Sequence, residues 1–63
     1  MDPSTLKDIY TTAIGAEKDS IVFYLGIRDL VPEKYGKNRV DAIIKEEMGH
    51  IEALSRQLLR IER

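Results

Sequence analysis

Apolar residues recur every three or four positions along two stretches of this 63-residue chain, a spacing that predicts two long helices. The first helix is expected from about residue 3 to about 31, and the second from about 39 to about 62. Asp2 followed by Pro3 is a typical helix start, an N-cap residue before a proline. The apolar positions are Leu6, Ile9, Tyr10, Ala13, Ile21, Tyr24, Ile27 and Leu30 in the first stretch, and Val40, Ile43, Ile44, Ile51, Leu54, Leu58 and Ile61 in the second.

Residues 32–38 interrupt both patterns and predict a turn. Pro32 disfavours helical geometry at the preceding Val31. Gly36 is suited to the left-handed conformation that ends a helical turn, here a single turn that begins at Pro32. Asn38 then reads as the N-cap of the second helix.

Two helices joined by a short connection predict an all-α fold, an antiparallel hairpin that occupies residues 1–63 as one domain. A chain of this size gains little stability from its own core and often needs a metal, disulfides or oligomerisation. The sequence contains no cysteine, which excludes disulfides, thiolate metal sites and cysteine nucleophiles. Metal binding or self-association is therefore expected.

The apolar surface of the first helix extends beyond one face, which predicts neighbours on more than one side. Three apolar residues lie away from its main stripe: Ile14, Val22 and Leu25. Glycines inside helices each cost about 1 kcal/mol relative to alanine, and they suggest close approach of another element. The two helices contain three of them: Gly15, Gly26 and Gly49.

The charges are balanced, with ten Lys and Arg residues against eleven Asp and Glu residues. No basic excess indicates a nucleic-acid partner, and no polybasic segment indicates an anionic membrane surface. The longest apolar run, residues 21–26, is too short to span a bilayer. The N-terminal residues lack the pattern of a secretory signal. A cytoplasmic protein is expected.

Glu47 and His50 lie on the apolar stripe of the second helix. Positions i and i+3 are neighbours on one helical face, so a carboxylate oxygen and an imidazole nitrogen at this spacing can reach one metal ion. A buried, unpaired carboxylate costs several kcal/mol, and a bound metal removes that cost. The alternative interpretation is a buried hydrogen-bonded pair without metal.

Glu17 is the acidic residue on the apolar face of the first helix. It is about as far from the turn as Glu47, so the hairpin is expected to place the two carboxylates side by side. Glu46 lies one step off the apolar stripe and is expected to be a solvated acid, or the substitute ligand if the register differs.

One hairpin thus offers three candidate ligands, Glu17, Glu47 and His50. Two hairpins related by a two-fold axis would offer four carboxylates and two imidazoles inside a four-helix bundle. This is the arrangement of carboxylate di-iron proteins, in which two helices each give a Glu and two give Glu-x-x-His. Mixed oxygen and imidazole ligands suit iron or manganese. A homodimer, or a higher homo-oligomer, with two ions per dimer is therefore expected.

The segments AIGAEKDSIVFY (residues 13–24) and IIKEEMGHIEAL (residues 43–54) resemble a rubrerythrin-type ferritin-like half-domain. The resemblance assigns the metal-binding Glu of the family's first helix to Glu17, and its Glu-x-x-His motif to Glu47 and His50. It implies a di-iron oxidoreductase that oxidises ferrous iron (ferroxidase) or reduces peroxide.

The chain departs from the family pattern, because it has two helices instead of four and lacks a cysteine-containing rubredoxin-like tail. A peroxide-reducing activity would therefore need an external electron donor. Two other interpretations stay open. One is a non-catalytic helical dimerisation module with a structural metal or no metal. The other is a piece of a longer protein, or a cargo-type ferritin-like subunit of a larger ring.

Overall fold

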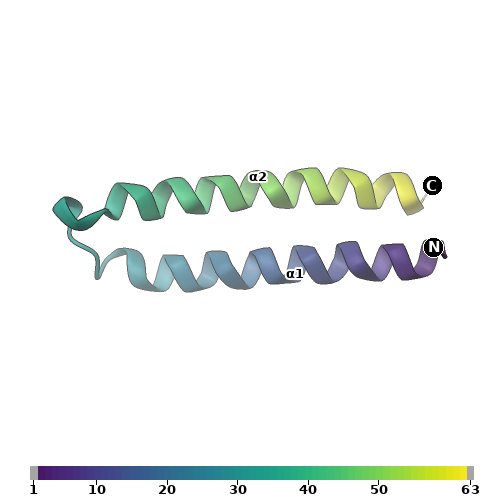
Figure 1. Cartoon of the computed structure of the whole chain (residues 1–63), viewed down its shortest axis with the longest axis horizontal. Helices are drawn as coiled ribbons and strands as arrows, with labels where there is room; N and C mark the ends of the chain where they lie inside the picture. Colours follow the sequence, from purple (N-terminus) through teal and green to yellow (C-terminus); the bar gives the residue numbers. More distant parts are fainter. Residues whose placement is uncertain (1, 63) are drawn as a thin grey trace.

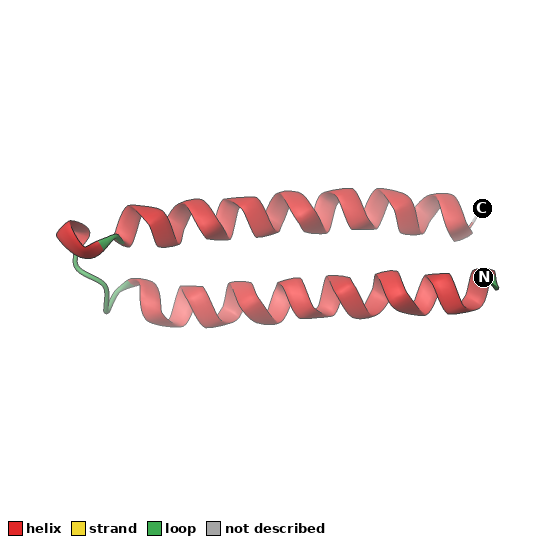
Figure 2. Cartoon of the chain, in the orientation of Figure 1, coloured by secondary structure: helices red, strands yellow, loops and turns green. Residues whose placement is uncertain are grey.

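The computed structural model describes residues 2–62 as two helices that lie side by side and run in opposite directions (Figure 1). Helix α1 is Pro3–Arg28 and helix α2 is Lys37–Glu62. A single 3-10 turn, η1 (Glu33–Tyr35), lies between them (Figure 2). The molecule measures 47 × 14 × 14 Å. Residues 2–62 contain no strand, so the predicted all-α hairpin is confirmed.

The start of α1 agrees with the sequence and its end does not. The Asp2 carboxylate accepts a hydrogen bond from the Ser4 backbone N–H at 3.2 Å, as an N-cap does. The helix ends at Arg28, three residues before the predicted end. Backbone hydrogen bonds from Leu30 N–H to Ile27 O and from Val31 N–H to Arg28 O span only three residues. The chain thus leaves the α-helix in a tight turn before it reaches Pro32.

Gly36 governs the start of α2. It adopts the predicted left-handed conformation, with φ at 111°. Its carbonyl accepts hydrogen bonds from the N–H groups of Arg39 and Val40 at 2.9 and 3.1 Å. The second helix therefore begins at Lys37, two residues before the predicted start. Asn38 lies inside the first turn and is not the N-cap that the sequence suggested.

The two helices face each other along stripes with seven-residue periodicity, which we call the inner stripes. Alternate steps of three and four residues are typical of paired helices. The inner stripes are Leu6, Tyr10, Ala13, Glu17, Ser20, Tyr24 and Ile27 on α1, and Val40, Ile44, Glu47, Ile51, Leu54, Leu58 and Ile61 on α2. Among residues 2–62, the buried apolar side chains are Ile21 and Ile44, which are 9% and 5% exposed. One hairpin alone therefore has a very small core.

Much apolar surface lies outside the hairpin interface. Four exposed residues lie seven positions apart, three on α1 and the fourth in the turn that follows it, and we call them the outer stripe of α1: Ile9, Ala16, Phe23 and Leu30. Val22 and Leu25 are exposed as well. The sequence correctly indicated that α1 is apolar on several sides. Neither helix in the described range is long and apolar enough to cross a membrane.

Glycines within the helices do not mark contacts inside the hairpin. A methyl group added at Gly15, Gly26 or Gly49 would meet no atom within 4 Å in the described part of the chain. Close approach of a further copy at these glycines, which the sequence suggested, stays a prediction.

Ion pairs near both ends of the hairpin define its register. Lys7 Nζ lies 3.4 Å from Glu62 Oε1 near the termini. Near the connection, Arg28 donates two hydrogen bonds to Asp41, at 2.8 and 3.2 Å. These hydrogen bonds lower the pKa of the Asp41 carboxyl and raise the pKa of Arg28. The Arg28–Asp41 pair thus joins the end of α1 to the start of α2.

Candidate metal site

Glu17 and His50 meet across the hairpin near the middle of the two helices. Glu17 Oε1 lies 3.5 Å from His50 Nδ1. The sequence argument placed Glu17 level with Glu47, but the structure places it level with His50, one helical turn further along α2. The ion pairs at the two ends of the hairpin show the same register. Lys7 lies beside Glu62 and Arg28 beside Asp41, so the part of α2 that is level with Glu17 is nearer to His50 than to Glu47.

Glu47 lies on the inner stripe of α2, one turn nearer the connection than His50. The register places it level with Ser20 and Ile21 of α1. Its Oε2 atom is buried and has no hydrogen-bond partner among the described residues. A buried polar group without a partner costs about 1–3 kcal/mol, and more if it is charged. Glu47 Oε2 thus lacks the cation or hydrogen-bond donor that would stabilise it.

The three candidate ligands differ in how far they are exposed. The His50 side chain is 60% exposed, whereas the Glu17 side chain is 27% exposed. The carboxylates therefore lie deeper than the imidazole, which forms the outer edge of the set. Glu46 is exposed, as its place off the stripe predicted.

The donor types fit a hard or borderline metal such as iron or manganese, since two carboxylates and an imidazole supply oxygen and nitrogen. The orphaned oxygen of Glu47 also fits a role as metal ligand. Within residues 2–62 of one chain, however, no three His, Asp or Glu side chains converge to hold an ion. The single hairpin therefore supplies a partial ligand set.

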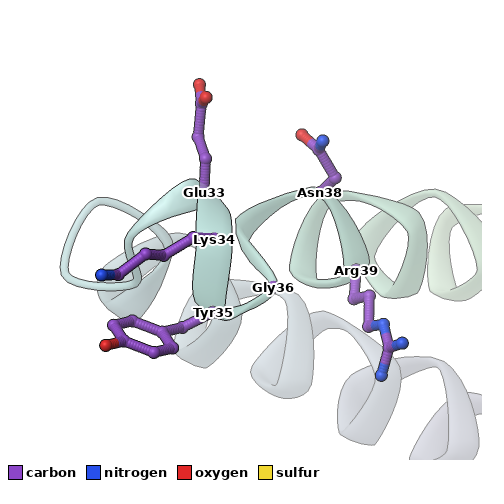
Figure 3. A pocket seen from close by; sticks show the side chains of 6 residues that line it. All are labelled: Glu33, Lys34, Tyr35, Gly36, Asn38 and Arg39. Carbon is purple, nitrogen blue, oxygen red and sulfur yellow. The ribbon is translucent and has the colours of Figure 1, made fainter.

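A recess at the connection is the other feature of interest. Its lining is drawn in Figure 3 and comprises Glu33, Lys34, Tyr35, Gly36, Asn38 and Arg39. The Lys34 ammonium lies 4.9 Å from the centre of the Tyr35 ring, a cation–π contact. This recess is at the end of the molecule, several helical turns from Glu17 and His50, so it does not belong to the candidate metal site.

Sequence reasoning missed the contact between Arg28 and Asp41. The structure pairs Asp41, near the start of α2, with the last residue of α1. A cation and an acid about equally far from the turn were the signal that could have predicted this pair.

Comparison of the chain with protein-family models, with curated proteins and with solved structures finds no match.

Proposed function

We propose that this chain is a carboxylate di-iron protein whose two-metal site forms between two copies of the hairpin. The observation that supports it most is the buried Glu47 oxygen, which lacks a hydrogen-bond partner in the described residues and lies one turn from the Glu17–His50 contact. A carboxylate with a buried oxygen that has no hydrogen-bond donor is stabilised by a nearby counter-charge. A metal shared with a second copy supplies that charge and also covers the exposed side of the set.

Glu17, Glu47 and His50 of each copy would hold the metals. The carboxylates offset the positive charge of the ions, and the imidazole contributes a neutral nitrogen donor. Bound iron supplies redox chemistry, as it moves between the ferrous and ferric states. Apolar residues next to the ligands, such as the buried Ile21 and the inner-stripe residue Ile51, would limit the entry of water.

The activity that we propose is oxidation of ferrous iron (ferroxidase) or reduction of peroxide, as the rubrerythrin-type resemblance implies. Both are oxidoreductase reactions. Reduction of peroxide would consume electrons from an external donor, since the chain has no cysteine and therefore no iron–sulfur or rubredoxin-like centre of its own. We place the protein in the cytoplasm.

A non-catalytic dimerisation module is the second candidate function. The observation that favours it is the exposed apolar surface of α1, which needs a partner whether or not metal binds. In that case Glu17 and His50 would serve as a polar contact that fixes the register. Val22 and Leu25 are exposed on a different side of α1. This surface would suit a further copy in a larger ring, or another part of a longer protein.

Metal analysis separates these functions. The protein is purified from iron-supplemented cells, its metal content is measured, and its mass is determined by sedimentation. About two irons per dimer, lost in Glu47→Ala and in His50→Ala but kept in Glu46→Ala, would support the di-iron proposal. A metal-free dimer whose stability is the same in all variants would support the dimerisation module. A stably folded monomer would exclude a shared site.

A further inference from the structure

The residues of the outer stripe of α1 are evenly spaced, so the row has the same spacing when it is read in either direction along the chain. Its four members are separated by seven residues each, so Ile9, Ala16 and Phe23 form one row along α1. Leu30 follows them in the turn at the end of α1. Phe23 and Leu30 are 61% and 79% exposed, and Ile9 is about half exposed. No contact within the hairpin accounts for this row.

If a two-fold axis passes between Ala16 and Phe23, every member of the row lies beside another member of the same row on the second copy. If a second α1 lies antiparallel across this axis, Ala16 lies beside the partner's Phe23, and Ile9 lies beside the partner's Leu30. The largest side chain of the row thus meets the smallest. Alternation of large and small residues is how facing helices pack without voids. An axis through either Ala16 or Phe23 would leave one end of the row without a partner.

The same axis passes through the candidate metal site. It passes beside α1 at the level of Ser20, which is level with Glu47 and one turn from Glu17. The candidate ligands lie near the middle of a hairpin that is 47 Å long. Two copies related by this axis would therefore overlap along almost their whole length and would bring both sets of ligands to one level.

The exposed area of one hairpin also matches a partner of this kind. A compact monomer of 7.2 kDa would expose roughly 4,100 Å². The hairpin exposes 4954 Å². The excess of about 800 Å² equals the area that each partner contributes to an interface of standard size.

We infer that the outer stripe of α1 docks against the same stripe of a second copy, antiparallel, with the two-fold axis between Ala16 and Phe23. This inference deepens the proposed function, because it names the surface that joins the two halves of the proposed metal site. It needs no metal to hold, so it can be tested separately.

Disulfide cross-linking tests it directly, because the chain has no cysteine of its own. Ala16→Cys and Phe23→Cys proteins are mixed in equal amounts, unfolded in urea, refolded together without metal and oxidised with diamide. The two introduced thiols are level in the inferred dimer, so a mixed disulfide between the two variants is expected as the main product. Mass spectrometry identifies the cross-linked peptides.

Each variant alone is the matched control. In the inferred dimer, two copies of the same introduced thiol are displaced by seven residues, about 10 Å along the axis, beyond the reach of a disulfide. Efficient cross-linking of Ala16→Cys to itself would indicate a parallel seam or a different axis and would overturn the inference. Ile9→Cys with Leu30→Cys provides a second pair that does not depend on the centre of the seam.

The cross-linking and metal results can fail independently. Mixed disulfides for both pairs in a protein that binds no iron would support the contact between the two outer stripes and exclude the di-iron function. Two irons per dimer without either mixed disulfide would support the di-iron function and overturn the inferred contact between the two outer stripes.

Discussion

Glu17 and His50 lie opposite each other across the hairpin, with 3.5 Å between the carboxylate oxygen and the imidazole nitrogen. Glu47, one turn away, has a buried oxygen without a hydrogen-bond partner in the described residues. The contrast between these two glutamates is informative. The first has a partner within the chain, whereas the second requires one from outside it. The structure thereby makes Glu47 the residue whose substitution distinguishes a structural role from a metal-binding role.

Replacement of Glu47 by leucine is expected to stabilise the metal-free protein. The substitution removes a buried oxygen that costs about 1–3 kcal/mol, and it completes the apolar stripe of α2. Urea unfolding in the presence of a chelator measures the change. In the presence of ferrous iron the order should reverse, because Glu47→Leu lacks a ligand whereas the unaltered chain gains stability from binding.

Glu46→Leu is the matched control, since Glu46 is the exposed neighbour on the same turn. Its effect on the free energy of unfolding should stay within about 0.5 kcal/mol. Equal effects of the two substitutions would show that the Glu47 oxygen is not orphaned in solution.

The Arg28–Asp41 pair predicts a dependence of stability on acid. The pKa of Asp41 is lowered in the folded protein from its ordinary value of 3.8. The unfolded state therefore binds more protons than the folded state in this range, and stability falls as the pH falls from about 4 through the lowered pKa. Thermal unfolding followed between pH 6 and pH 2 should show this loss.

Asp41→Asn should flatten that part of the pH profile and lower the melting temperature at pH 6. The same measurement on Asp8→Asn is the control, because Asp8 is an exposed acid that forms no ion pair in the described residues. An unchanged profile for Asp41→Asn would show that the pair does not persist in solution.

Glycines at two positions should respond in opposite ways to substitution by alanine. Gly36 has φ at 111°, so Gly36→Ala is expected to destabilise the hairpin by about 1–2 kcal/mol. Gly49 is in the middle of α2 and faces open space, so Gly49→Ala should stabilise it by about 1 kcal/mol. Chemical denaturation of both variants measures the difference. Destabilisation by Gly49→Ala would reveal a neighbour that approaches α2 from outside the hairpin.

The core of the single hairpin should be sensitive at Ile44. This side chain is the most buried one in residues 2–62, so Ile44→Val should cost about 0.5–1.5 kcal/mol although it removes one methylene. Val22→Ala removes more carbon from an exposed position and should change stability by less than about 0.5 kcal/mol. Circular dichroism during thermal unfolding compares the two. A larger loss for Val22→Ala would show that the side of α1 with Val22 is the more important contact surface.

The sequence predicted the two helices, the Asp2 cap and the left-handed Gly36, but not the start of α2 or the register between the helices. Apolar periodicity, Asp2 and Gly36 are local signals, and each was confirmed. The end of α1 depends on three-residue hydrogen bonds at Leu30 and Val31, for which the sequence contains no strong signal. Counting residues from the turn assumes a symmetric connection, and the structure instead places His50 level with Glu17.

The candidate site was predictable only in part for a related reason. Spacing on the helix grouped Glu47 with His50, and the hairpin brought Glu17 to them. The burial of one carboxylate oxygen depends on the packing of side chains from both helices, which a sequence pattern does not specify. The proposed contact with a second copy depends on the same kind of detail, as the inferred pairing of Ala16 with the partner's Phe23 illustrates.

The small number of buried residues has a consequence for the life of the protein in the cell. A lone copy held together around Ile21 and Ile44 should open often and expose its backbone to proteases. A copy with a partner is protected, and the fraction with a partner rises with concentration. We therefore expect degradation to remove unpaired chains preferentially, so that the amount of protein present rises more steeply than its rate of synthesis.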